Sequence, residues 1–198
     1  MTLILASGSA GRLAILRAAG VDVEAHVPAV DEDSIKEAMV GDGAKPRDIA
    51  DALAEAKATK ISRKFSGELV LGCDQILVTA EGLLLDKPQN ADDAKAHLRI
   101  LSGSTHRLMS AAVICEGGIP VWRMVDTAKM TMRPLSKEFI DDYVERYWGE
   151  IRHCVGVYRI EAEGAQLFTG ISGSHFTVIG LPLLPVLDYL RVRAKLPS

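Results

Sequence analysis

One stretch of the sequence, Leu69–Val78, constrains the fold more than any other. It reads LVLGCDQILV, and its apolar and β-branched residues predict a buried β-strand. Asp74 interrupts this apolar run. A buried carboxylate costs several kcal/mol unless it is paired, hydrogen-bonded or facing a wet cleft. Asp74 is therefore either a satisfied structural acid or a functional group that the strand carries to a site, and the strand alone leaves both open.

Size and charge favour one globular domain that is not a general nucleic-acid binder. The chain has 198 residues, 48% of them apolar, and 23 basic residues against 26 acidic ones give a formal charge of −3. A chain of this length can form one sizeable core or two small lobes. We expect a single domain over residues 1–198, built as two lobes that share one cleft. The weakly acidic balance makes a nucleic-acid partner unexpected.

The cysteines, the histidines and the first residues bear on compartment and metal binding. Three cysteines without a close pair suggest free thiols in a reducing compartment. The five histidines lack the HxH or HxxxH spacing of a histidine metal site. The start, MTLILAS, has neither the basic region of a signal peptide nor an apolar run long enough to span a membrane. These features predict a cytoplasmic protein without a membrane segment.

The N-terminal turn has the form of an anion site. A short strand at Leu3–Ala6 is followed at once by a Gly/Ser turn and a helix that ends near Gly20. Free backbone N–H groups, with the hydroxyl groups of Ser7 and Ser9, suit a phosphate. Arg12, in the first helical turn, can fork onto the same anion. The alternative is an ordinary N-cap serine in a tight turn.

Two later segments add charged candidates. The acids Asp31, Glu32 and Asp33 follow the second expected strand, so they either begin a helix, capped by Asp33 or Ser34, or hold a divalent cation. A long helix expected over about residues 46–64 places Lys57 close to its apolar stripe. Such a lysine either extends outward along the surface or points into a cleft.

The remaining pattern predicts the fold class. EGLLLDKP resembles the return arm of a hairpin that brings Lys87 near Asp74, and a second hairpin spans His106–Cys115 and Pro120–Met132. The Gly-punctuated segment Trp148–Gly164 is more typical of a functional loop than of a linker. Strands that alternate with helices early, followed by a hairpin, predict an α/β fold with a mixed, twisted sheet in two lobes around a cleft.

Several short segments stand in one order along nearly the whole chain: Leu5–Arg12, Asp31-Glu32, Leu53–Ala58, Gly72–Gln75, Asp86–Pro88, Leu101–His106 and Ile179–Leu183. In that order they resemble the motifs of the Maf family of nucleoside triphosphate pyrophosphatases. No one segment is specific, whereas the ordered set is. The resemblance implies the α/β fold shared with inosine triphosphate pyrophosphatases, with the active site in a cleft between lobes.

The resemblance also implies an activity and roles for residues. It implies a cytoplasmic enzyme, usually a homodimer, that uses Mg²⁺ or Mn²⁺ to cleave a nucleoside triphosphate into a monophosphate and pyrophosphate. Asp74 would accept a proton from water, and Glu32 together with Asp74 would hold the cation. The groups that would bind the phosphates are Ser7, Ser9, Arg12, Lys57 and Lys87.

Two departures from the family pattern concern base choice and activity. Gln75 and Glu161 resemble the branch that acts on 7-methyl-GTP, whereas enzymes that prefer dTTP and UTP carry threonine and glutamine there. A carboxylate can accept two hydrogen bonds from guanine, which fits Glu161. Ala10 and Gly11 replace a Pro-Arg pair, and Gly11 stands where the 7-methyl-GTP branch has tryptophan. A dTTP/UTP pyrophosphatase and a catalytically weak nucleotide-binding regulator of cell division therefore remain alternatives.

Overall fold

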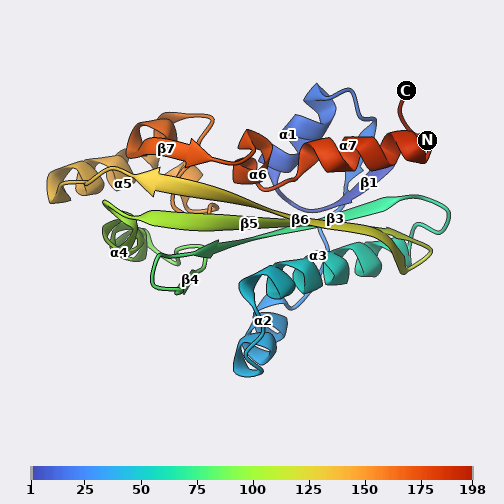
Figure 1. Cartoon of the computed structure of the whole chain (residues 1–198), viewed down its shortest axis with the longest axis horizontal. Coiled ribbons are helices and arrows are strands. Elements are labelled where there is room, and N and C mark those ends of the chain that lie inside the picture. The colour runs from blue at the N-terminus through green and yellow to red at the C-terminus, as the bar shows by residue number, and fades with distance from the viewer. Residues whose placement is uncertain (1, 198) are drawn as a thin grey trace. The chain divides into compact units, whose positions relative to one another are not determined.

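The computed structural model describes residues 2–197 and shows a mixed seven-stranded sheet with helices on its faces (Figure 1). The strands are β1 (Leu3–Ala6), β2 (Val23–Ala25), β3 (Val70–Val78), β4 (Leu84–Leu85), β5 (Thr105–Glu116), β6 (Ile119–Met132) and β7 (Phe168–Ser172). The helices are α1 (Ala10–Ala18), α2 (Glu32–Gly41), α3 (Pro46–Ser62), α4 (Ala91–Leu101), α5 (Lys137–Ile151), α6 (His175–Ile179) and α7 (Leu183–Val192), with a short 3-10 helix at Glu163–Leu167. The predicted α/β class with a mixed sheet is confirmed.

Hydrogen bonds set the strand order as β2-β1-β3-β5-β6-β7, with β4 beside β3. β1 runs parallel to both β2 and β3. The pairs β3–β4 and β6–β7 are antiparallel. The chain divides into two compact units, the first made of residues 1–75, 109–126 and 180–198 and the second of residues 76–108 and 127–179. The cleft expected between two lobes stays a prediction.

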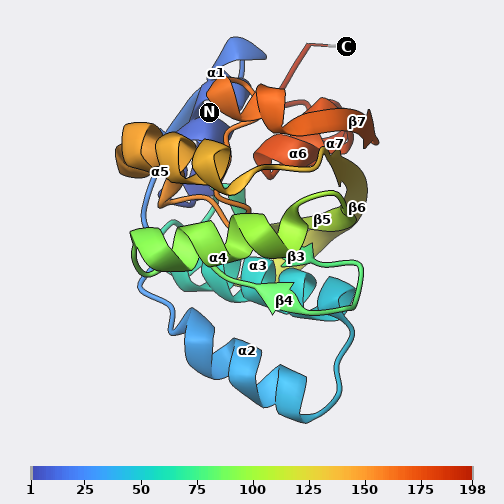
Figure 2. The ribbon, with the colours of Figure 1, turned by 90° about the vertical axis from the view of Figure 1, so that its left-hand side faces the viewer.

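In the first unit, helices cover both faces of the strands. Figure 1 shows α1 and α7 on one side and α3 on the other. α2 packs on α3, and it lies on the side of α3 away from the strands (Figure 2). All four residues of β1 are buried, as are most of β3. This arrangement explains why both strands read as apolar runs, since a parallel strand covered on two faces has no solvent side.

Gly72 allows α3 to approach β3 closely. A Cβ atom added at Gly72 would overlap the carbonyl oxygen of Ala54 and lie 2.7 Å from the backbone nitrogen of Ala58. The backbone of α3 therefore lies directly on the strand at this point, where no side chain separates them. Lys57 is on this buried face of the helix.

The second unit has its own apolar core. α4 packs against α5, and the core between these helices and the strands includes Leu98, Met130, Met132 and Tyr143. α5 is capped by Ser136, whose hydroxyl accepts from the backbone N–H of Phe139.

Two local predictions are wrong in detail, and one strand was not predicted. Asp31, not Asp33 or Ser34, caps α2: its carboxylate accepts from the backbone N–H of Ser34 at 3.1 Å and from the Ser34 hydroxyl at 2.8 Å. α5 continues to Ile151, so the irregular segment begins later than Trp148. β7 was not expected, because four of its five residues are exposed and it has no apolar alternation.

We predict that Gly72→Ala destabilises the protein, because the new methyl group would force α3 away from β3. Overpacking of this kind costs about 1–3 kcal/mol and sometimes more. The matched control is Gly170→Ala, also in a strand, where an added Cβ meets no atom within 4 Å. Denaturant unfolding of both variants measures the difference, and equal free energies of unfolding would contradict the close approach.

Candidate active site

The N-terminal turn forms the predicted helix cap. The Ser9 hydroxyl accepts from the backbone N–H of Arg12 at 3.3 Å, and the backbone N–H of Ser9 donates to the Ser7 hydroxyl at 3.2 Å. Ser7 is buried, whereas Ser9 is half-buried. Gly11 is half-buried in the first turn of α1. The turn therefore contains an ordinary serine N-cap, which was the alternative to a phosphate site. Its phosphate-binding role stays a prediction.

Arg12 uses much of its guanidinium within the protein. Its Nε donates to the carbonyl of Gly180 at 2.8 Å. Its Nη1 donates to the carbonyl of Cys73 at 3.1 Å and to the Ser7 hydroxyl at 3.3 Å. Only Nη2 has no hydrogen-bond partner among residues 2–197. Arg12 thus joins the N-terminal turn to β3 one residue before Asp74.

Lys57 lies between two carboxylates. Its Nζ is 2.7 Å from Oδ1 of Asp74 and 2.7 Å from Oε2 of Glu32. Lys57 and Asp74 are each only 7% exposed, while the side chain of Glu32 is 45% exposed. Lys57 is therefore buried and does not extend outward along the surface, while the cleft into which it was expected to point stays a prediction. Asp74 is paired with Lys57 and keeps only a small exposed fraction.

Burial controls the ionisation of Asp74. Loss of hydration raises the pKa of the Asp74 carboxyl, the charges of Lys57 and Arg12 lower it, and Glu32 raises it slightly, so that the pKa stays above its ordinary value. A carboxylate whose pKa is raised toward neutral is a better proton acceptor than an ordinary aspartate. This direction is compatible with a proton acceptor at position 74, and that role stays a prediction.

The donor set fits a magnesium-type cation. Oδ1 of Asp74 and Oε2 of Glu32 both contact one ammonium, so they can be no farther apart than twice 2.7 Å. No group of three or more His, Cys, Asp or Glu suited to a metal occurs within residues 2–197. Mg²⁺ is commonly bound by one or two carboxylates, with waters and substrate phosphates completing its shell. Glu32 and Asp74 supply that pair, although the metal itself stays a prediction.

The neighbours of Asp74 on β3 differ in character. The side-chain amide of half-buried Gln75 donates to the Ser110 hydroxyl at 3.0 Å. Cys73 is completely buried, and burial raises the pKa of its thiol to about 11. Cys73 is thus an unreactive core residue, while the role of Gln75 in base choice stays a prediction.

Lys87 and Glu161 belong to the second unit, where both are exposed. Each lies within electrostatic range of Cys154, whose pKa burial raises to about 11, with Glu161 raising it further and Lys87 lowering it. The second unit therefore holds these two predicted residues in one neighbourhood. Their predicted approach to Asp74 stays a prediction.

One buried pair in the second unit was not predicted from the sequence. His106 is fully buried, its Nε2 lies 2.7 Å from the hydroxyl of Tyr158, and its Nδ1 has no partner among residues 2–197. Burial lowers the pKa of His106 to about 4, so the ring is neutral at pH 7. The motif Leu101–His106 was the available signal, but it did not say what the histidine contacts.

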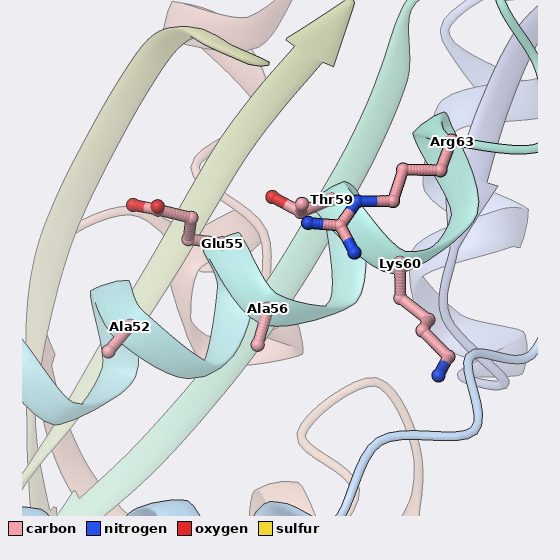
Figure 3. A pocket seen from close by; sticks show the side chains of 6 residues that line it. All are labelled: Ala52, Glu55, Ala56, Thr59, Lys60 and Arg63. Carbon is pink, nitrogen blue, oxygen red and sulfur yellow. The ribbon is translucent and has the colours of Figure 1, made fainter. Parts of the chain in front are cut away.

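A shallow groove runs along α3, on a side where Glu55, Thr59 and Arg63 contact the β5–β6 hairpin. It is lined by Ala52, Glu55, Ala56, Thr59, Lys60 and Arg63 (Figure 3). Asp74, Lys57 and Glu32 are not among its lining residues. The groove is therefore not part of the carboxylate cluster.

Comparison with known proteins identifies the family of the chain. Residues 2–193 match the family described as Maf-like protein. A nucleoside triphosphate pyrophosphatase of Ruegeria sp. is 52% identical over 188 residues, covering 95% of this chain and 94% of the relative. A relative from Sphingopyxis alaskensis with the same name is 48% identical over the full length of both chains. A 7-methyl-GTP pyrophosphatase of Mesorhizobium japonicum is 47% identical over 96% of this chain and 94% of that protein.

The carboxylate pair, the serine turn and the mixed sheet thus occur in a chain that belongs to the Maf family. None of the helices within residues 2–197 has the length and apolar character needed to cross a membrane.

We predict that Lys57→Met lowers stability in a pH-dependent way. Removing one partner of a buried pair costs about 3–5 kcal/mol because it leaves an uncompensated charge. Without Lys57 the pKa of Asp74 rises further, so the folded state takes up a proton that the unfolded state lacks at pH 5–7. The loss should therefore shrink from pH 7 to pH 5 in denaturant unfolding. Lys60→Met, an exposed lysine of the same helix, is the control; an equal loss at both pH values would show that Asp74 does not depend on Lys57.

We predict that His106 makes the protein acid-sensitive. Its folded pKa of about 4 lies below the ordinary value of 6.5, so the unfolded state binds the proton first as the pH falls. The contribution of His106 is complete above pH 6.5 and is lost progressively toward pH 4. Unfolding free energies of wild type and His106→Gln across this range should differ in slope, with the variant flatter. Parallel curves would refute the prediction.

Proposed function

We propose that this chain is a nucleoside triphosphate pyrophosphatase that hydrolyses its substrate to a monophosphate and pyrophosphate, and that 7-methyl-GTP or another modified nucleotide is preferred. The observation that carries the proposal is the half-open cluster of Asp74, Lys57 and Glu32 beside the Ser7–Arg12 turn. A carboxylate base, a lysine ammonium and an anion-binding turn together suit hydrolysis of a phosphoanhydride. The cytoplasmic location and the homodimer implied by the resemblance are parts of this proposal.

In the proposed reaction, Asp74 accepts a proton from water while the water oxygen bonds to the α-phosphorus. The bond between that phosphorus and the oxygen bridging to the β-phosphorus breaks, and pyrophosphate leaves with the electron pair. The raised pKa of Asp74 makes it a stronger base than an ordinary aspartate, which suits this task. Hydroxyl and backbone donors of the Ser7–Ser9 turn would orient the phosphates.

Positive groups would balance the charge of the triphosphate. Lys57 is close enough to Asp74 to contact a phosphate beside it, and Lys87 is an exposed candidate from the second unit. When bound by Glu32 and Asp74, a divalent cation would supply Lewis-acid polarisation of the phosphate and would favour deprotonation of water.

Base preference is supported by two side chains and one relative. Gln75 and Glu161 resemble the 7-methyl-GTP branch, and the Mesorhizobium japonicum relative carries the name of that activity. A carboxylate such as Glu161 can accept from two guanine N–H groups at once and is attracted to the positive charge of a 7-methylated ring. Gly11 lacks the stacking surface of the tryptophan that the 7-methyl-GTP branch has at this position, so a preference for dTTP or UTP is the competing outcome.

We predict that purified protein with Mg²⁺ or Mn²⁺ releases pyrophosphate, and not orthophosphate, from 7-methyl-GTP faster than from GTP, dTTP or UTP. Asp74→Asn should lower kcat by about 10²–10⁴-fold, the usual contribution of a general base. Asp33→Asn, an exposed acid of α2, is the control.

Three results would change the proposal. Faster release from dTTP or UTP would move the substrate to the other branch. An active Asp74→Asn enzyme would place the base elsewhere. If no nucleotide in the panel releases pyrophosphate, the hydrolase proposal fails and a nucleotide-binding role without turnover takes its place.

A further inference from the structure

Arg12 connects three segments that are far apart in the sequence. Arg12 bonds to its own turn through Ser7, to β3 through the carbonyl of Cys73, and to the connection between α6 and α7 through the carbonyl of Gly180. Three of the five N–H groups of its guanidinium are used in this way. Each acceptor is on a different segment, so the planar group fixes their relative positions.

Gly180 is shaped to receive this guanidinium. Its φ of +109° is in the region that favours glycine, and an added Cβ would lie 3.1 Å from both Nε and Nη2 of Arg12. The backbone at this position favours glycine, and an added Cβ would require the Arg12 guanidinium to shift by a few tenths of an ångström. The Arg12 side chain therefore packs closely against Gly180.

The acceptor on β3 links Arg12 to Asp74. The carbonyl of Cys73 belongs to the peptide unit whose nitrogen is that of Asp74. The Ser7 hydroxyl, also bonded to Arg12, in turn accepts from the backbone N–H of Ser9. One side chain therefore holds both the predicted phosphate turn and the strand that carries the predicted base.

We propose that Arg12 acts as a positioning residue, which sets the serine turn and Asp74 at a fixed distance, and that this role exceeds any role as a phosphate ligand. The kinetic consequence rests on the proposed function, whereas the structural one does not. A lysine in its place would keep the charge, but a single ammonium lacks the rigid planar fork of the guanidinium. A positive charge alone at position 12 should therefore not restore the positioning role of Arg12.

The test compares Arg12→Lys, Arg12→Gln and Gly180→Ala with the control Gly20→Ala. Gly20 also has a positive φ, +78°, but an added Cβ there meets no atom within 4 Å. Small displacements of catalytic groups cost up to about 10²-fold in rate. We expect Arg12→Lys and Arg12→Gln to lower kcat alike, by about tenfold or more, with KM changed less than about threefold. Gly180→Ala should reproduce this loss, and the double variant Arg12→Lys/Gly180→Ala should be no worse than either single one.

A second measurement does not depend on turnover. Hydrogen–deuterium exchange should speed up in peptides covering residues 5–13 and 70–76 in both Arg12 variants and in Gly180→Ala, but not in Gly20→Ala. If Gly180→Ala does not fold, the two Arg12 variants carry both measurements.

The two proposals fail in different ways. Wild-type protein that releases no pyrophosphate defeats the proposed function, and the exchange data then decide the role of Arg12 alone. Arg12→Lys with near-normal kcat beside Arg12→Gln with a KM raised about tenfold would show a phosphate ligand held by charge, and would overturn the positioning role. Unchanged exchange in both peptides would overturn it as well.

Discussion

The ammonium of Lys57 allows β3 to carry Asp74 in the interior, because it compensates the charge of this buried carboxylate. Asp74 is in the most apolar strand of the chain, where an unpaired charge would be strongly unfavourable. Lys57 reaches it only because α3 lies directly on β3 at Gly72. The same ammonium holds Glu32 of α2. The position of α3, the ionisation of Asp74 and the approach of the second carboxylate therefore depend on one contact.

Arg12 provides a second set of constraints on the same strand. Its bonds to the Cys73 and Gly180 carbonyls are made from the face of β3 that carries α1, whereas Lys57 comes from α3. The peptide segment around Asp74 is thus held from two helices by two cations. Rigid support of this kind is what a reacting group needs, since a catalytic geometry is lost with small displacements.

Much of the fold could be predicted because its signals are local. The apolar run of β3, the turn after β1 and the β5–β6 hairpin are each contained in short windows of sequence. Asp74 could be singled out for the same reason, as one acid within such a run. β7 escaped prediction because its residues are exposed, so burial gave them no pattern.

The contacts of the site could not be predicted, because they depend on distances between segments. Helical spacing placed Lys57 near the apolar stripe of α3, but its partners depend on how closely Gly72 lets the helix approach. The sequence favoured Asp33 or Ser34 as the cap of α2, whereas the backbone geometry selects Asp31. The acceptors of Arg12 include a carbonyl at position 180, which no local pattern could indicate.

The charges of the site also set a condition of electroneutrality on whatever enters it. Two anions, Glu32 and Asp74, stand beside two cations, Lys57 and Arg12, and each anion already contacts a counter-ion. The site therefore has no uncompensated charge that could attract an ion. A charged group that enters must replace one of the existing ion pairs. A ligand that brings its own countercharge, as a phosphate paired with a cation does, can make that exchange without leaving a buried charge unpaired.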